Sequence, residues 1–238
     1  MRQVPTPQPP VGIAGDGRVA RHLTHYLTLL GIPTRSWSRR HGPRDPGEAF
    51  AECGTVLLLL RDDVIEEFVR VWPDLRRKRL VHCSGCLFTT VAESAHPLMT
   101  FGPELYDLDS YRRIAFILQT GGRSLAELLP GLPNRSFTIP ADDKPLYHAL
   151  AVMAGNFSSI LWTRFLAELE SRWGIPASAA TPYLEQVTAN LRTDYAGALT
   201  GPIVRRDTHT IHANLAALEG DRFREIYRAF VRVYDEHR

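Results

Sequence analysis

The chain has 238 residues, of which 44% are hydrophobic and 23% charged, and its 28 basic and 26 acidic residues leave a formal net charge of +2. This composition is typical of a folded globular protein, and so small a net charge argues against nucleic acid or an anionic membrane as partner. The longest aliphatic run, 56–60, is far too short to cross a membrane. We expect residues 1–10, which are polar and rich in proline, to form a disordered arm rather than a signal peptide. Three cysteines cannot make a disulfide framework, so we expect a cytoplasmic protein.

The first half of the chain alternates strand and helix patterns. Short apolar segments typical of strands lie at 11–15, 33–38, 55–60, 80–83, 114–118 and 136–139. Apolar residues at helical spacing follow the first, third and fifth of these segments. Repeated strand–helix–strand units predict an α/β fold with a doubly wound, mostly parallel sheet over residues 11–141.

The second half, residues 142–238, is expected to be entirely helical. One long helix is predicted over 142–172, with Pro145 tolerated because it falls in the first turn. Further helices are expected from Thr181 to about residue 195, after Asp207 and after Asp221. Since no strand pattern of comparable strength follows Pro140, we place a domain boundary near residue 141.

Residues 15–20 follow the pattern Gly-x-Gly-x-x-Ala between the first predicted strand and the first predicted helix. In that context the motif binds the pyrophosphate of a dinucleotide. Gly15 permits the tight turn, Gly17 lets the backbone approach the ligand, and Ala20 lets the helix pack closely on the strand. Arg18 and Val19 would lie at the helix N-terminus, whose free N–H groups attract the anion. The alternative is a tight turn without a ligand.

The end of the second predicted strand favours NADP over NAD. An NAD site usually has an acidic residue about 20 positions after the motif, which binds the ribose 2′-hydroxyl. This chain has Ser38, Arg39 and Arg40 there instead. A hydroxyl and two guanidinium groups suit a 2′-phosphate. A solvated basic loop is the alternative, because arginine is abundant throughout the chain.

Together with the first domain, several segments in order along the chain resemble the Rossmann-like proteins with a DUF2520 C-terminal domain: HCSG at 82–85, HPLMTF at 96–101, KPLYHA at 144–149, GNF at 155–157 and LTGP at 199–202. These proteins are similar to pyrroline-5-carboxylate reductase, the F420-dependent NADP oxidoreductases and the 6-phosphogluconate dehydrogenase-like superfamily. The resemblance implies an N-terminal NADP-binding domain, a helical C-terminal domain for substrate, and a homodimer formed through the C-terminal helices.

Two segments at the ends of predicted strands are candidates for the ligand crevice, which in a doubly wound sheet lies beyond the carboxyl ends of the strands. Leu60 and Arg61 follow one strand, and Ser84 and Gly85 follow another. We expect all four to contact the cofactor, and Ser84 could also donate a hydrogen bond to the substrate. A turn without a ligand is the alternative for Ser84 and Gly85.

The long helix offers the candidate proton donors. Lys144 and His148 are four residues apart and share one face, and Gly155 lies on the same face with room for a ligand. The related β-hydroxyacid dehydrogenases place a lysine and an asparagine on the equivalent helix, facing the nicotinamide. By this analogy His148 or Lys144 donates the proton and Asn156 orients the substrate. The alternative for each residue is a role in packing or at the surface.

Further candidates lie elsewhere in the chain. His96 could line the crevice, Thr200 could approach the site of a partner subunit, and residues 205–206 supply two arginines for an anionic substrate. His209 and His212 lack a neighbour of suitable type and spacing, and a single Cys-x-x-Cys segment at 83–86 is half a site at most, so we expect no metal.

These patterns predict an oxidoreductase that transfers a hydride between NADP(H) and a C=O or C=N group of a small, anionic metabolite. Two alternatives stay open: a sensor or regulatory protein that binds NADP without turnover, and an F420-linked reductase.

Overall fold

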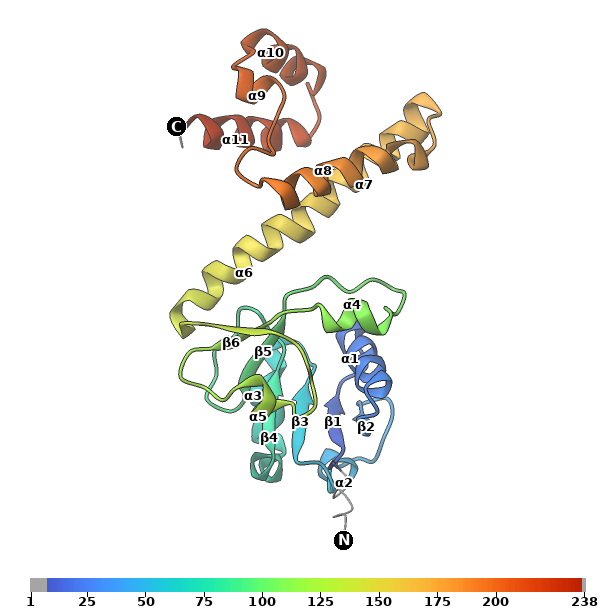
Figure 1. The fold of residues 1–238 in the computed structure, drawn as a ribbon, viewed down its shortest axis with the longest axis vertical. Helices are drawn as coiled ribbons and strands as arrows, with labels where there is room; N and C mark the ends of the chain where they lie inside the picture. The colour runs from blue at the N-terminus through green and yellow to red at the C-terminus, as the bar shows by residue number, and fades with distance from the viewer. Residues whose placement is uncertain (1–7, 237–238) are drawn as a thin grey trace. The chain divides into compact units, whose positions relative to one another are not determined.

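The computed structural model describes residues 8–236 (Figure 1). Residues 1–7, most of the predicted disordered arm, lie outside this range, and Gln8 donates a hydrogen bond of 2.6 Å to the carbonyl oxygen of Pro130. The contacts divide the chain into two compact units, the first ending at Ile160 and the second beginning at Leu161. This division falls later than the expected boundary near residue 141, because the start of the long helix packs on the α/β unit through Lys144.

The first unit contains a seven-stranded sheet with the strand order β2-β1-β3-β4-β5-β6-β7. Neighbouring strands are parallel except for β5 and β6, which pair antiparallel. The predicted mostly parallel α/β fold is therefore confirmed. The strands are β1 (Val11–Ala14), β2 (Thr34–Trp37), β3 (Thr55–Leu58), β4 (Arg79–His82), β5 (Glu93–Pro97), β6 (Phe116–Gln119) and β7 (Ser136–Ile139).

Six of these strands correspond to the apolar segments recognised in the sequence, and β5 was not predicted. Its sequence, Glu-Ser-Ala-His-Pro, carries three polar residues in five and gives no apolar alternation. Its backbone is nevertheless held between two neighbours, since it pairs with β4 on one side and with β6 on the other. The pairing with neighbouring strands, rather than local preference, makes this segment a strand.

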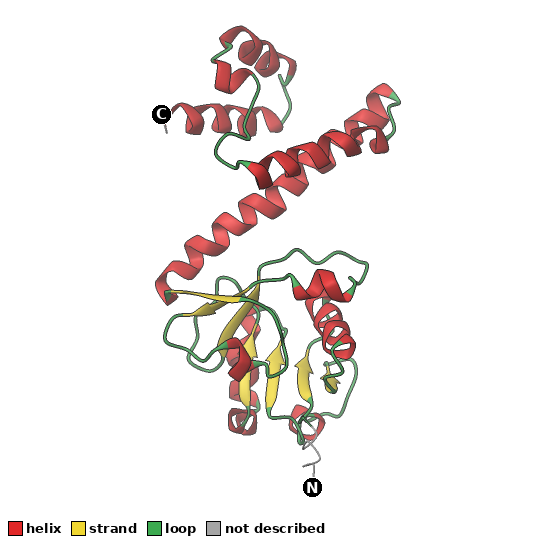
Figure 2. Cartoon of the chain, viewed as in Figure 1, coloured by secondary structure: helices red, strands yellow, loops and turns green. Residues whose placement is uncertain are grey.

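The helices of the first unit cover the two faces of the sheet. Residues of β1 and β3 alternate between two apolar clusters: Ile13 and Leu57 pack with α1, whereas Leu58 packs with α3. This alternation is expected for strands buried on both faces. The helices are α1 (Arg18–Leu29), α2 (Pro46–Ala49), α3 (Asp62–Val71), α4 (Leu108–Arg112), α5 (Leu125–Leu128) and α6 (Lys144–Val152), with 3₁₀ turns η1 (Pro73–Arg77) and η2 (Ala141–Asp143) (Figure 2).

The short helices α2 and α4 were not predicted, because four or five residues give no measurable helical period. Each begins at a capping aspartate. The side chain of Asp45 accepts from the N–H of Gly47, and that of Asp107 accepts from the N–H of Ser110. Such caps satisfy backbone donors that a helix start leaves free.

A buried amide ties the core below α1 together. Asn134 accepts a hydrogen bond from the hydroxyl of Tyr26 at 2.6 Å. Its amide nitrogen donates to the carbonyl oxygens of Tyr111 at 2.8 Å and Ile114 at 2.9 Å. A polar side chain can lie in this apolar core because its hydrogen-bonding groups are paired.

The predicted long helix is present with one irregularity. The chain is helical through α6 and α7 (Ser158–Trp173), and the residues between them, Met153–Phe157, form a wider π turn, η3. The second unit is helical as predicted, although α9 was not foreseen and Thr181 lies inside α8 instead of capping it. Its remaining elements are η4 (Ala177–Ala180), α8 (Thr181–Thr193), α9 (Pro202–Arg205), α10 (Thr208–Ala217) and α11 (Phe223–Glu236).

Across residues 8–236, none of the helices combines the length and apolar character that a membrane span requires.

Candidate functional site

The turn between β1 and α1 has the geometry of an anion-binding cradle. Gly15 has a φ of +131°, and a Cβ there would overlap the carbonyl oxygen of Leu59. Gly17 is the N-cap of α1, no side chain caps the helix, and the space beside its Cα is open. The first N–H groups of α1 therefore have no side-chain partner and remain available to an anionic ligand.

This cradle lies where the strand order reverses. β1 is flanked by β2 on one side and β3 on the other, so the chain runs from β1 to β2 on one side and then crosses from β2 to β3 on the other. In open α/β sheets the crevice beyond the carboxyl ends of such strands is the usual ligand site. The residues that follow β1, β2, β3 and β4 are the ones singled out in the sequence.

The residues after β2 form a tight turn. Ser38 is buried, and its Oγ accepts hydrogen bonds from the N–H groups of Arg40 at 3.3 Å and His41 at 3.2 Å. The turn exposes the side chains of Arg39 and Arg40, which have no ionic partner within residues 8–236. Two free guanidinium groups on a fixed turn can bind a phosphate group.

The residues after β3 and β4 are joined by the carboxylate of Asp62, which no sequence pattern singled out as a site residue. Arg61 forms an ion pair with Asp63, so its guanidinium is already engaged. The Oγ of Ser84 donates to Asp62 at 2.6 Å and accepts from the N–H groups of Cys86 and Leu87. Ser84 therefore organises the turn after β4, with both its donor and its acceptor capacity in use.

Lys144 is buried beneath this turn. Its side chain is 2% exposed, and Nζ donates to the Oγ of Ser94 at 2.7 Å and to the carbonyl oxygen of Ser84 at 3.3 Å. Burial lowers the pKa of the amine. The hydrogen bonds of Lys144 tie the first turn of α6 to β5 and to the turn after β4.

Two histidines meet at Gly85. A Cβ on this glycine would overlap Nδ1 of His148 and would lie 3.1 Å from Nε2 of His96. The two rings are 5.8 Å apart between centroids and almost perpendicular. On its other side, Nδ1 of His96 is 2.8 Å from the hydroxyl of Tyr147. Only a residue without a side chain leaves room for both imidazoles.

The pKa values of this region follow from burial. Desolvation, aided by the neighbouring His148 and Lys144, lowers the pKa of His96 to about 4. Desolvation and the Lys144 cation also lower the pKa of His82 to about 4. Both rings are therefore neutral near pH 7.

A cavity of about 790 Å³ brings many of the predicted residues together. It extends from the start of α1 to the π turn and includes part of the segment after β5. Lys144 and Ser84 do not line it. The candidate residues along its wall are Arg18, Val19, His96, His148, Gly155 and Asn156.

The other candidates are not among the residues that line this cavity. Thr200 and the arginines at 205–206 belong to the second unit, where Thr200 is exposed and Arg206 ends α9 with a φ of 52°. Within the residues described, no three potential ligands are grouped as a metal ion would require. Burial raises the pKa of the Cys83 thiol to about 12, which leaves it protonated and unreactive.

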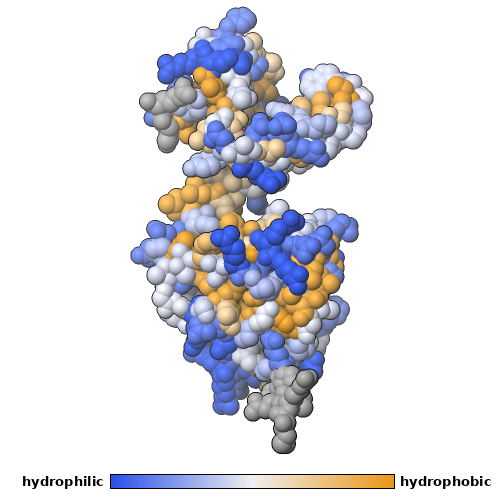
Figure 3. Space-filling view, viewed as in Figure 1, coloured by the Kyte–Doolittle hydropathy of each residue, from blue (hydrophilic) through white to orange (hydrophobic). Residues whose placement is uncertain are grey.

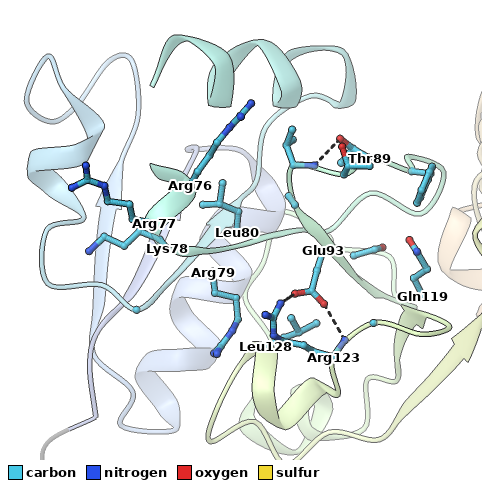
Figure 4. Close-up of a pocket in the computed structure, with 17 residues that line it drawn as sticks. Arg76, Arg77, Lys78, Arg79, Leu80, Thr89, Glu93, Gln119, Arg123 and Leu128 are labelled. Atoms are coloured by element: carbon cyan, nitrogen blue, oxygen red, sulfur yellow. Dashed lines mark hydrogen bonds and ion pairs between the residues drawn. The ribbon is translucent and has the colours of Figure 1, made fainter. Parts of the chain in front are cut away.

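A second cavity, of about 760 Å³, has a basic lining that includes Arg76 and Arg79 (Figure 4). None of the predicted site residues lines it. Its glutamate, Glu93, is paired with Arg123, and Thr89 donates to Glu66 at 2.7 Å.

A doubly wound sheet with a glycine cradle at the end of β1, followed by a helical region, defines the class of Rossmann-like proteins with a helical C-terminal part. Residues 119–233 match DUF2520, a domain of unknown function, which confirms the resemblance recognised in the sequence. A comparison with curated protein sequences gave no match.

Solved structures share the fold along almost the whole chain. A Bacteroides fragilis protein, proposed to be an NADP oxidoreductase, is 19% identical with a TM-score of 0.77 and covers 96% of this chain and 98% of its own. A Thermotoga maritima protein is 23% identical with a TM-score of 0.69, at coverages of 95% and 97%. Plasmodium falciparum pyrroline carboxylate reductase, solved with NADP bound, is 12% identical with a TM-score of 0.59 and 97% coverage of both chains.

Proposed function

We propose that this protein is an NADP(H)-dependent oxidoreductase that reduces a C=O or C=N group of a small metabolite. One observation carries the proposal: a single cavity is lined both by the start of α1, next to the dinucleotide cradle, and by two imidazoles that can bind a polar reacting group. The NADP bound to the Plasmodium reductase of the same fold supports the choice of cofactor.

The residues of the chain fit each part of NADP. The uncapped N–H groups at the start of α1 suit the pyrophosphate, and Arg18 adds a positive charge there. Arg39 and Arg40 suit the 2′-phosphate, because they are exposed and unpaired on the turn that Ser38 fixes. The nicotinamide end would then reach the cavity, where the cofactor supplies the hydride.

The chain's own contribution is to bind and orient the substrate. His96, His148 and Asn156 line the cavity, and Nε2 of His96 and Nδ1 of His148 lie beside Gly85. Lys144 takes a different role from the proton donor considered above, since its buried amine is occupied by Ser94 and Ser84. Of the two candidate donors we therefore choose His148.

We also propose that the protein is a homodimer. Large apolar side chains with exposures of 48–62% recur at alternating spacings of four and three residues along α6, η3 and the start of α7: Leu146, Leu150, Met153, Phe157 and Ile160. Figure 3 shows exposed hydrophobic residues on this part of the molecule. Such a stripe is the pattern by which one helix packs on another, and a second copy of the chain supplies a matching helix.

The cofactor is tested by calorimetric titration of the purified protein with NADPH and with NADH. We expect NADPH to bind more tightly than NADH, and Arg39→Ala to weaken NADPH binding about tenfold without affecting NADH. Arg77→Ala, a similarly exposed arginine remote from the cradle, is the matched control. Absence of binding by any pyridine coenzyme would refute the proposed function.

The test of turnover is the oxidation of NADPH with a panel of aldehydes, 2-oxo acids and cyclic imines. Tight NADPH binding without oxidation across the panel would favour a sensor.

The dimer is tested by sedimentation: Leu150→Glu places a charge in the apolar stripe and should yield monomers, whereas Glu170→Lys, on the exposed surface, should not.

A further inference from the structure

The hydroxyl of Tyr147 determines which nitrogen of His96 carries the proton. Tyr147 lies 2.8 Å from Nδ1 of His96, and burial raises the pKa of its phenol, so the hydroxyl keeps its proton. Within the described residues no other acceptor is seen for this hydroxyl. Tyr147 therefore donates to Nδ1, and a neutral imidazole that accepts at Nδ1 carries its hydrogen on Nε2.

That hydrogen lies on the side of the ring that faces Gly85, next to the ring of His148. Nε2 of His96 is 3.1 Å from the position where a Cβ of Gly85 would stand, and Nδ1 of His148 is nearer still. In the described part of the chain Nδ1 of His148 is buried and has no hydrogen-bond partner. A buried polar atom without a partner is rare in folded proteins and calls for a ligand or water.

The charges around the cavity distinguish between classes of substrate. Along the cavity the ionisable side chains are Arg18, His96 and His148, and none of the described lining residues is a carboxylate. The nearby Asp62 is hydrogen-bonded to Ser84 and is not part of the wall. A protonated imine is a cation and would find no carboxylate on this wall, whereas a carbonyl oxygen requires only hydrogen-bond donors.

We propose that His96 and His148 together bind the oxygen of a carbonyl substrate, and that Tyr147 is the positioning residue that makes His96 a donor at Nε2. This inference rests on the proposed function and narrows its substrate class to aldehydes, ketones or oxo acids. With NADPH bound, the cofactor would supply the hydride to the carbonyl carbon, and the π pair would move onto oxygen. The oxygen would take a proton from Nδ1 of His148, and the solvent would return a proton to that ring.

The tautomer of His96 can be measured without any substrate. The full-length protein is labelled with ¹⁵N-histidine, and the ring nitrogens of His96 are assigned by comparison with His96→Gln. In the parent protein we expect a pyrrole-type signal from Nε2 and a pyridine-type signal from Nδ1. In Tyr147→Phe, which removes only the hydroxyl, we expect averaged signals of both tautomers. An Nδ1–H tautomer in the parent, or identical signals in the two proteins, would overturn the role of Tyr147.

Kinetics test the carbonyl assignment. We expect NADPH oxidation with pyruvate or benzaldehyde to exceed that with 1-pyrroline, and Tyr147→Phe to lower kcat about five- to tenfold. His96→Gln keeps an N–H donor near the position of Nε2 and should retain more activity than His96→Asn. Preferential oxidation with 1-pyrroline, or equal activity of the two His96 variants, would overturn the proposal.

Calorimetry with NADPH separates this inference from the proposed function. The parent, Tyr147→Phe and both His96 variants are expected to bind NADPH within twofold of one another. If the parent protein does not bind NADPH, the proposed function as a whole is refuted. If it binds NADPH normally but uses 1-pyrroline preferentially, only the carbonyl assignment is refuted.

Discussion

His82 makes the stability of the α/β unit sensitive to acid. The side chain is 1% exposed, and its Nδ1 accepts a hydrogen bond from the N–H of Ser84 at 3.2 Å. Because burial and the Lys144 cation lower its pKa from 6.5 to about 4, the folded protein keeps this ring neutral at pH 5 while the unfolded chain protonates it. The unfolded state then binds more protons, so stability is full above pH 6.5 and falls as the pH approaches 4.

The size of the effect follows from the two pKa values. Between pH 7.5 and pH 5.0 a histidine with a pKa of about 4 in the folded protein and 6.5 in the unfolded chain removes about 2 kcal/mol from the free energy of unfolding. His96 contributes a similar loss, because its pKa is lowered to about 4 as well.

The assay compares urea unfolding of the parent and of His82→Asn at both pH values. The Oδ1 of asparagine can accept the Ser84 N–H in place of Nδ1 but does not titrate. The free energy of unfolding of the variant should therefore fall by about 2 kcal/mol less than that of the parent, while His96 and the carboxylates act equally in both. An identical pH dependence in the two proteins would refute the argument that His82 is buried as a neutral ring.

Four further substitutions have outcomes set by the geometry. Gly15→Ala should lower the free energy of unfolding by more than about 2 kcal/mol, because φ is +131° and the added methyl group overlaps the Leu59 carbonyl. Gly17→Ala should change the free energy of unfolding by less than about 1 kcal/mol, because the added methyl group faces open space. Urea titrations of both variants check these values. Asn134→Ala should lower the free energy of unfolding by about 2–4 kcal/mol, since buried carbonyl oxygens lose their donor, and a melting temperature close to the parent's would contradict the hydrogen bonding described. Gly85→Ala should displace the facing imidazole and reduce NADPH oxidation at least tenfold in a steady-state assay, and unchanged activity would contradict the proposed site.

Local patterns were sufficient to predict most of the fold. Period-3.6 spacing predicted α1 and α3, and continuous apolar runs predicted β1 and β3, because these elements bury regular faces against the sheet. β5 escaped prediction because its polar sequence becomes a strand only between its two neighbours. The π turn at η3 also has no pattern that periodicity detects.

The candidate site could be predicted only in part, because its decisive contacts join distant parts of the chain. The hydrogen bond between His96 and Tyr147 spans 51 positions, and that between Lys144 and Ser94 spans 50. The face that it shares with His148 drew attention to Lys144, yet no sequence pattern distinguishes a buried structural amine from a proton donor. Tyr147 stands beside His148 in the KPLYHA segment, which was the one available signal for it.

The absence of a side chain at Gly85 helps to identify related chains that have the same pair of histidines. Any chain that retains both imidazoles in this arrangement must have glycine here, whereas a chain with a bulkier residue must have lost or moved one ring. A single backbone position can thus mark, among otherwise divergent homologues, the chains that are able to keep both rings in place.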